Sequence, residues 1–177
     1  MTEHEIHNIC KKYRITNYTI NPDGSIDVDG NVDLSDMNLT ELPIKFNKVR
    51  GGFYCYGNKL TSLEGSPNYV GGSFYCYSNK LTSLKGSPEI VGGIFSCNNN
   101  KLTSLVGCPK EVGCSFYCSY NKLKTLEHSP LIIGGHFYCM NNPLESFEGY
   151  NSSYDKIINT NKEKLIRKTK LKIIENL

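Results

Sequence analysis

The stretch FYCYGNKLTSLEGSP, which runs from Phe53 to Pro67, is followed by FYCYSNKLTSLKGSP, from Phe74 to Pro88. The second copy begins 21 residues after the first, and the spacing continues through three further copies without insertion or deletion. The phenylalanines that open the copies are Phe53, Phe74, Phe95, Phe116 and Phe137. A fixed period of this length indicates one supersecondary unit stacked on copies of itself. The chain is therefore predicted to be a solenoid.

Other residue types keep the same period. They form a cysteine series, an asparagine series and a leucine series: Cys55, Cys76, Cys97, Cys118 and Cys139; Asn58, Asn79, Asn100, Asn121 and Asn142; Leu60, Leu81, Leu102, Leu123 and Leu144. A worn copy precedes them in the same register: Val32, Leu34, Leu39, Leu42 and Val49. We therefore predict about six repeats in residues 32–150, between an N-terminal cap at 1–31 and a C-terminal cap at 151–177. The whole chain is expected to be one folding unit.

Each repeat begins with an alternating pattern that is typical of a short strand. In Phe53-Tyr54-Cys55-Tyr56, the phenylalanine and the cysteine would face one way and the tyrosines the other. Strands stacked in register would form a parallel sheet with about 4.8 Å between neighbours. Because 21 residues leave little room for a helix in each coil, the return path is expected to be extended or to have single turns.

Both ends of the chain show cap signals. At the N-terminus, Thr2 and Glu5 form a capping-box pattern ahead of a short helix. Its expected apolar face is Ile6, Ile9, Cys10 and Tyr13. The segment YTI-NPDG-SIDV then predicts a hairpin that leads into the first coil.

At the C-terminus, residues 151–177 predict a capping helix, with Ser152 and Asp155 as its start. Its expected apolar stripe is Tyr154, Ile158, Leu165, Ile166, Ile173 and Leu177, with an interruption near Asn159–Asn161. The stripe would cover the unpaired edge and the core of the last coil, as the ends of a solenoid require.

The repeat residues resemble those of leucine-rich repeats, whose core reads L-x-L-x-x-N-x-L; here Phe53, Cys55, Asn58 and Leu60 occupy the four slots. The chain departs from that pattern by using Phe and Cys in place of the strand leucines. The short period and the LTSL…P segment are similar to the bacterial short repeats of secreted effectors. The strings NKLTSLEGSP, VGG and YTINPDGSIDVDG are similar to repeat proteins of tailed phages.

This resemblance covers residues 15–150. It implies a leucine-rich-repeat-like solenoid with a parallel β-sheet on a concave side, an irregular convex side and helical caps at both ends. It also implies a phage accessory protein that acts in an infected bacterial cytoplasm, by binding or inhibiting a host factor.

The repeated cysteines and asparagines are expected to be structural. No pair of cysteines has C-x-x-C spacing, and in-register strands present thiols poorly for disulfides. We therefore predict a buried ladder of reduced thiols, with a bond between Cys108 and Cys114 as the alternative for those two. Free thiols favour a reducing compartment, the cytoplasm. The asparagine amides would bond backbone groups of adjacent coils.

The candidate binding residues lie on the outward face of the predicted sheet. One tyrosine row is Tyr54, Tyr75, Tyr117 and Tyr138, with Ser96 in the middle repeat. A second row begins with Tyr56 and Tyr77 and continues with Asn98, Ser119 and Met140. A lysine row, Lys59, Lys80, Lys101 and Lys122, ends at Pro143. Because tyrosine offers a large rigid surface with a polar end, the rows favour a protein partner. The simpler interpretation is that the tyrosines only cover the sheet and the lysines form a solvated rim.

Nucleic acid is the alternative ligand, since bases stack on aromatic rings while lysines contact phosphates. The repeats are nearly neutral, however, and the excess positive charge lies in the C-terminal segment: Lys162, Lys164, Arg167, Lys168, Lys170 and Lys172. Binding to a membrane surface is less favoured, and no apolar run approaches the length of a membrane span.

Signals for an enzyme or a cofactor are poor. His4, His7 and Cys10 are spaced in steps of three, which drift around a helix, and His128 and His136 have no recognisable catalytic partners. The acids of DGSIDVDGNVD do not fit a calcium loop, because the twelfth position is Asn38. The N-terminal MTEHEIHNIC is not a secretory leader. We therefore expect a non-enzymatic binding module without a metal or cofactor.

Overall fold

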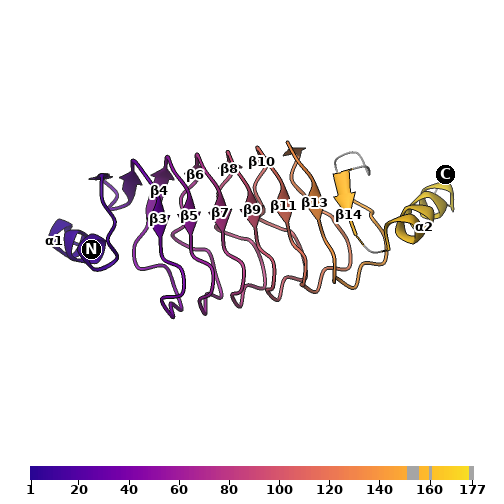
Figure 1. The fold of residues 1–177 in the computed structure, drawn as a ribbon, viewed down its shortest axis with the longest axis horizontal. Helices are drawn as coiled ribbons and strands as arrows, with labels where there is room; N and C mark the ends of the chain where they lie inside the picture. The colour runs from indigo at the N-terminus through magenta and orange to yellow at the C-terminus, as the bar shows by residue number, and fades with distance from the viewer. Residues whose placement is uncertain (151–155, 160, 176–177) are drawn as a thin grey trace.

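The computed structural model describes residues 1–150, 156–159 and 161–175, and it shows a solenoid with two parallel sheets (Figure 1). The coils lie side by side along the long axis of the molecule, with one helix at each end and the two termini at opposite ends. Equivalent residues of neighbouring coils pair with a register of 21, as Phe53 does with Phe74. The predicted solenoid and its period are confirmed.

Two sheets form the two long sides of the coils. The first, here called the tyrosine sheet, contains β3 (Val32–Asp33), β5 (Phe53–Tyr54), β7 (Phe74–Tyr75), β9 (Phe95–Ser96), β11 (Phe116–Tyr117), β13 (Phe137–Tyr138) and β14 (Ile157–Ile158). The second, here called the return sheet, contains β1 (Tyr18–Ile20), β2 (Ile26–Val28), β4 (Phe46–Val49), β6 (Tyr69–Val70), β8 (Ile90–Val91), β10 (Glu111–Val112) and β12 (Ile132–Ile133). The β1–β2 pair is antiparallel and every other strand pair is parallel.

The return sheet corrects the expectation of an irregular convex side. Its strands are only two residues long in most coils, yet they pair in register, as Tyr69 does with Ile90. Because hydrogen bonding sets the strand spacing on both sides of the coil, both sides advance by the same distance per repeat. The structure is thus a β-solenoid in which each coil contributes a strand to each of two sheets.

The core is a set of ladders, one residue type stacked on itself. The rings of Phe74, Phe95 and Phe116 stack with centroids 5.4 and 5.1 Å apart and with interplanar angles of 5° and 12°. The ladder cysteines and the leucines of the four middle coils, from Leu60 to Leu126, are likewise fully buried, whereas Leu39, Leu42 and Leu144 of the end coils are partly buried. Burial of the cysteine series is confirmed, and all eight cysteines of the chain are unpaired, including Cys108 and Cys114.

Asparagine side chains join each coil to its neighbours, as predicted. The Asn79 amide nitrogen donates to the Cys55 carbonyl at 2.9 Å, and its amide oxygen accepts from the Leu60 backbone N–H at 2.9 Å. The same geometry recurs at Asn100 and Asn121. The asparagine therefore satisfies backbone groups that the turn after the tyrosine sheet leaves unpaired.

At the corner before each strand of the tyrosine sheet, consecutive coils approach too closely for a side chain. A Cβ on Gly92 would lie 2.2 Å from the Gly71 carbonyl oxygen, and one on Gly113 would lie 2.1 Å from that of Gly92. Glycine is therefore required here by contact between backbones, which explains its recurrence in the sequence.

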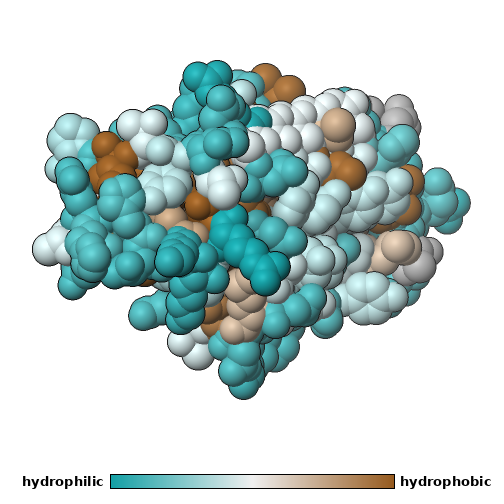
Figure 2. Space-filling model, turned by 60° about the vertical axis from the view of Figure 1, so that its left-hand side comes forward, coloured by the Kyte–Doolittle hydropathy of each residue, from teal (hydrophilic) through white to brown (hydrophobic). Residues whose placement is uncertain are grey.

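The N-terminal cap follows the prediction. Helix α1 (Glu3–Lys12) starts at a capping box in which Thr2 and Glu5 exchange backbone and side-chain hydrogen bonds. Ile6 and Cys10 are buried against the first coil. Seen from this end, the molecule is mostly hydrophilic, and its hydrophobic side chains form separate patches (Figure 2). The hairpin of β1 and β2 is also confirmed.

The C-terminal end differs from the prediction. Ile157 and Ile158, expected in a helix, form β14, which pairs with β13 and extends the tyrosine sheet. Helix α2 spans Lys162–Glu175, so it begins later than expected; Ser152, Asp155 and Tyr154 lie outside the described residues. Thr169 of α2 accepts a hydrogen bond from the Phe147 backbone N–H at 2.8 Å. Leu165 is buried at the same end of the core.

Candidate site on the outer face of the tyrosine sheet

The outward tyrosines of the tyrosine sheet are half-buried, and their rings contact one another in pairs. Tyr54 and Tyr75 have ring centroids 5.4 Å apart, and Tyr117 and Tyr138 are 4.4 Å apart and nearly parallel. Strand pairing sets these contacts, because Tyr54 is in register with Tyr75 and Tyr117 with Tyr138. The alternation of the strand holds these rings outside while the phenylalanines point inward.

The second tyrosine row is shorter. Tyr56 and Tyr77 stack with centroids 4.5 Å apart, and Tyr77 also contacts Tyr75 at 6.0 Å. The row continues as Asn98, Ser119 and Met140, as the sequence indicates. The aromatic surface is therefore two rings wide in the coils that begin at Phe53 and Phe74, and one ring wide in the coils that begin at Phe116 and Phe137.

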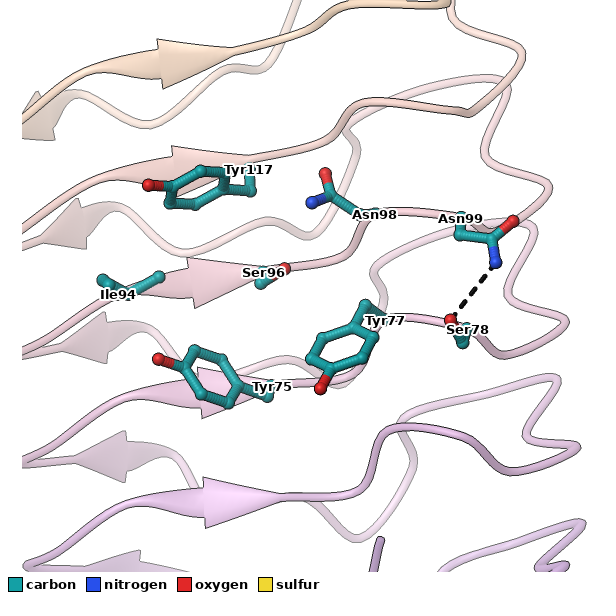
Figure 3. A pocket seen from close by; sticks show the side chains of 8 residues that line it. All are labelled: Tyr75, Tyr77, Ser78, Ile94, Ser96, Asn98, Asn99 and Tyr117. Atoms are coloured by element: carbon teal, nitrogen blue, oxygen red, sulfur yellow. Dashed lines mark hydrogen bonds between the residues drawn. The ribbon is translucent and has the colours of Figure 1, made fainter. Parts of the chain in front are cut away.

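A hollow interrupts the first row at β9. There Ser96 replaces the tyrosine, and the gap between Tyr75 and Tyr117 opens into a pocket of about 390 Å³ (Figure 3). Its lining residues are Tyr75, Tyr77, Ser78, Ile94, Ser96, Asn98, Asn99 and Tyr117. Ser96 is only 7% exposed and forms the floor.

The pocket is lined by uncharged groups whose positions are fixed by hydrogen bonds between coils. The Asn98 side-chain oxygen accepts from the Ser119 backbone N–H at 2.7 Å. Asn99 donates to the Ser78 hydroxyl at 3.2 Å. Partial burial raises the pKa of Tyr77 and of Tyr117, and a neighbouring tyrosine hydroxyl adds to each shift. Tyr77 and Tyr117 therefore remain neutral hydrogen-bonding groups at physiological pH.

The four lysines that the sequence places beside the tyrosines do not line this pocket. Lys59, Lys80, Lys101 and Lys122 are all exposed. They follow the turn at the end of each strand, where their backbone N–H groups donate to the preceding coil, as Lys80 does to Leu60. Among the ion pairs of the described residues, none involves these lysines. They form a cationic rim beside the tyrosine rows.

The outer face of the return sheet is a second surface, which the sequence did not predict. The outward residues of successive strands are Lys48, Tyr69, Ile90, Glu111 and Ile132. Lys48 lies over the Tyr69 ring, 5.1 Å from its centroid. No residue type repeats in adjacent coils, so this face has no ladder.

The remaining chemical groups do not converge on a reactive site. Burial raises the pKa of the ladder thiols, to about 12 for Cys139. His7 shares a hydrogen bond with the Tyr18 hydroxyl. Within residues 1–150, 156–159 and 161–175, no three His, Cys, Asp or Glu side chains gather as metal ligands would. The described helices also include none long and apolar enough to cross a bilayer.

The structure places every tyrosine and lysine proposed from the sequence as a binding residue, and it brings together three tyrosine pairs. It also adds Ser78, Ile94, Asn98 and Asn99 as pocket residues. The signal for this pocket in the sequence is the interruption of the tyrosine series at Ser96. The outer row of the return sheet had no comparable signal, because its residues are all different from their neighbours.

The sequence matches no protein-family model, and comparison with curated proteins and with solved structures also gives no significant match. The fold is therefore established by the structure itself, as a β-solenoid of about 21 residues per coil.

Proposed function

We propose that this chain is a non-enzymatic protein-binding module whose binding surface is the outer face of the tyrosine sheet. One observation carries the proposal: four of five consecutive repeats place a tyrosine at the same outward position, whereas no residue type occurs more than twice at the outward position of the return sheet. Packing of the core does not determine the residue type at the outward position of either sheet, because side chains at both positions point away from the core. Rows of rigid, neutral, half-buried aromatic rings are typical of surfaces that bind proteins.

The resemblance to phage repeat proteins supplies the biological setting of the proposal. In that setting the chain acts in the cytoplasm of an infected bacterium and binds or inhibits a host protein. The buried thiols are compatible with a reducing compartment. This part of the proposal is based on the analogy of the repeat motifs.

Nucleic acid remains the alternative, favoured by one observation, the exposed lysine rim beside stacked tyrosines. Against it, the pocket between the tyrosines is lined by no cation. A nucleic acid would place a phosphate near each stacked base, and phosphate contacts dominate such affinities.

Affinity capture from bacterial lysate, with and without nuclease, tests the proposal. The double variant Tyr75→Ala/Tyr117→Ala should lose the partner, because aromatic anchors at the centre of an interface cost about 2 kcal/mol each on truncation. The matched control is Tyr69→Ala/Ile90→Ala on the return sheet, which should capture as the wild type does. Lys80→Gln/Lys101→Gln should weaken capture slightly, with little salt dependence.

A nucleic-acid ligand would reverse this ranking. The lysine variant would then lose capture, nuclease would abolish it, and affinity would fall steeply with salt. If the tyrosine double variant captures every partner that the wild type captures, the proposed surface is wrong.

A further inference from the structure

We infer that the gap at Ser96 is a binding site for one aromatic side chain of the protein partner. This side chain inserts between Tyr75 and Tyr117 and completes the tyrosine row. The inference rests on the proposed function and specifies the group that the site receives. It begins from the arrangement in Figure 3, in which Tyr75 and Tyr117 lie on the strands to either side of β9 with Ser96 and Ile94 between them.

The width of the gap fits one ring. Tyr75 and Tyr117 are separated by two strand spacings, about 9.6 Å. A ring placed midway would have a neighbour about 4.8 Å away on each side. The existing outer contacts have similar separations, 5.4 Å for Tyr54–Tyr75 and 4.4 Å for Tyr117–Tyr138. An inserted ring would therefore join two ring pairs that are already in contact, the tilted Tyr54–Tyr75 pair and the stacked Tyr117–Tyr138 pair.

The inner face of the same strands shows the completed arrangement. Phe95 fills the position on β9 that lies between Phe74 and Phe116, with centroid separations of 5.4 and 5.1 Å. Ser96 is the next residue along the same strand, and it leaves the corresponding outer position without a ring. The backbone spacing of this solenoid thus accommodates an uninterrupted aromatic ladder at these three strands.

The repeat that lacks the tyrosine also changes its apolar surface. Ile94 is half-buried and lines the pocket, whereas the equivalent residues of the other repeats are small or polar: Gly52, Ser73, Ser115 and His136. In the middle repeat, Ile94 therefore gives the pocket an apolar wall, and the small Ser96 side chain leaves space above the strand. An aromatic group would bury against Ile94 as well as against the two rings.

The absence of charged residues from the pocket lining favours an uncharged aromatic group. The eight lining residues are all uncharged. A nucleobase would bring a phosphate, which the lining residues offer no cation to neutralise, whereas a Trp, Tyr or Phe side chain brings no charge. Asn98 has an amide nitrogen on the pocket wall that can donate to the polar end of a Tyr.

The chain contains no tryptophan, so a tryptophan probe can be observed without background. N-acetyltryptophanamide, excited selectively, should show a saturable change in emission with the wild type and with Ser96→Ala. Ser96→Tyr supplies the missing ring within the chain, and it should weaken probe binding at least about 10-fold, in line with the energy of an aromatic pair and the loss of space. Tyr75→Ala removes one wall and should weaken binding as well, which keeps the test valid if Ser96→Tyr folds poorly.

Two competitors identify the class of ligand. N-acetylleucinamide should compete poorly, and adenosine monophosphate should compete more weakly than N-acetyltyrosinamide. Equal probe binding by the wild type and Ser96→Tyr, in a folded variant, would overturn the inference. Stronger, salt-sensitive competition by adenosine monophosphate would also overturn it, in favour of a nucleotide site.

The outcomes separate this inference from the proposed function. If the probe does not bind but Tyr75→Ala/Tyr117→Ala still loses the partner, the face binds protein without using the gap. If the probe binds and the double variant captures the partner normally, the gap accepts a ring but the proposed interface is wrong.

Discussion

The two outer faces of the solenoid are built by the same coils, yet they differ in whether successive coils keep the same residue type at the outward position. On the tyrosine sheet, the outward position holds Tyr54, Tyr75, Tyr117 and Tyr138 around the single exception Ser96. On the return sheet, the outward position holds Lys48, Tyr69, Ile90, Glu111 and Ile132. The strands behind these two faces pair in the same parallel register.

The difference shows which repeated residues the fold requires. Inside the middle coils, side chains stacked at a fixed spacing pack closely when they have the same size and shape, and the phenylalanine, cysteine and leucine ladders have that property. The return sheet shows that an outward position accepts side chains as different as those of Lys48, Tyr69 and Glu111. Packing of the core therefore does not explain why the outer tyrosines are repeated, and the proposed explanation is that they bind a partner.

Alkaline pH should produce the largest effect, on the core that both faces share. Burial keeps the five ladder thiols protonated in the folded chain, whereas unfolded thiols ionise above their ordinary pKa of 9.0. Because the pKa of each thiol is higher in the folded chain than in the unfolded chain, the free energy of unfolding keeps its full value below pH 9 and decreases as the pH rises above 9. At pH 10 each thiol should cost about 1.4 kcal/mol, or roughly 7 kcal/mol for the ladder. Urea unfolding at pH 8 and pH 10, under reducing conditions, measures this loss.

The control for this measurement removes one thiol. Cys97→Ala should retain about four fifths of the thiol contribution, so its loss of unfolding free energy between the two pH values should be about 1.4 kcal/mol smaller. If the free energy of unfolding of the variant has the same pH dependence as that of the wild type, burial does not raise the pKa of the Cys97 thiol.

The next effect contrasts the two faces of one strand. Phe95→Ala opens a cavity in the middle of the inner ladder and should lower the free energy of unfolding by about 3–5 kcal/mol. Ser96→Ala, one residue away on the outward side, should change it by less than about 0.5 kcal/mol. Chemical denaturation of the two variants provides the comparison. Similar losses for both would contradict the assignment of an inner and an outer side to β9.

The smallest effect compares tyrosines on the two outer faces. Tyr75 is half-buried and contacts Tyr54 and Tyr77, so Tyr75→Ala should cost about 1 kcal/mol. Tyr69 is 38% exposed on the return sheet, so Tyr69→Ala should cost less than about 0.5 kcal/mol. Thermal unfolding with matched buffers resolves the difference. A cost of several kcal/mol for Tyr75 would mean that the tyrosine row is primarily structural.

The strongly periodic features were predictable from the sequence. The inward direction of Phe53 and Cys55 follows from strand alternation, and the bonding of Asn79 follows from its fixed place after the strand. The capping box at Thr2 and Glu5 and the hairpin of Tyr18–Val28 carry local signals of their own. Each of these depends on residues close in sequence or on the period itself.

The return sheet was not predictable in the same way. A strand of two residues, such as Ile90–Val91, is too short to show alternation, and its pairing becomes visible only when the coils are stacked. Ile158 was assigned to a helix because its spacing fits an apolar helical stripe, and Ile157 lay within the same predicted helix; pairing with β13 decided the conformation of both. The pocket at Ser96 exists because a ring is absent, and its depth depends on neighbours 21 residues away on both sides.

Hydroxyl-radical footprinting of the tyrosines, with and without the captured partner, tests the central claim most directly. Both outer faces carry reactive tyrosines, so one experiment compares them within a single molecule. We predict that the partner protects Tyr75 and Tyr117 from oxidation and leaves Tyr69 as reactive as in the free chain. Protection of Tyr69 with unchanged reactivity at Tyr75 and Tyr117 would contradict the claim and assign the interface to the return sheet.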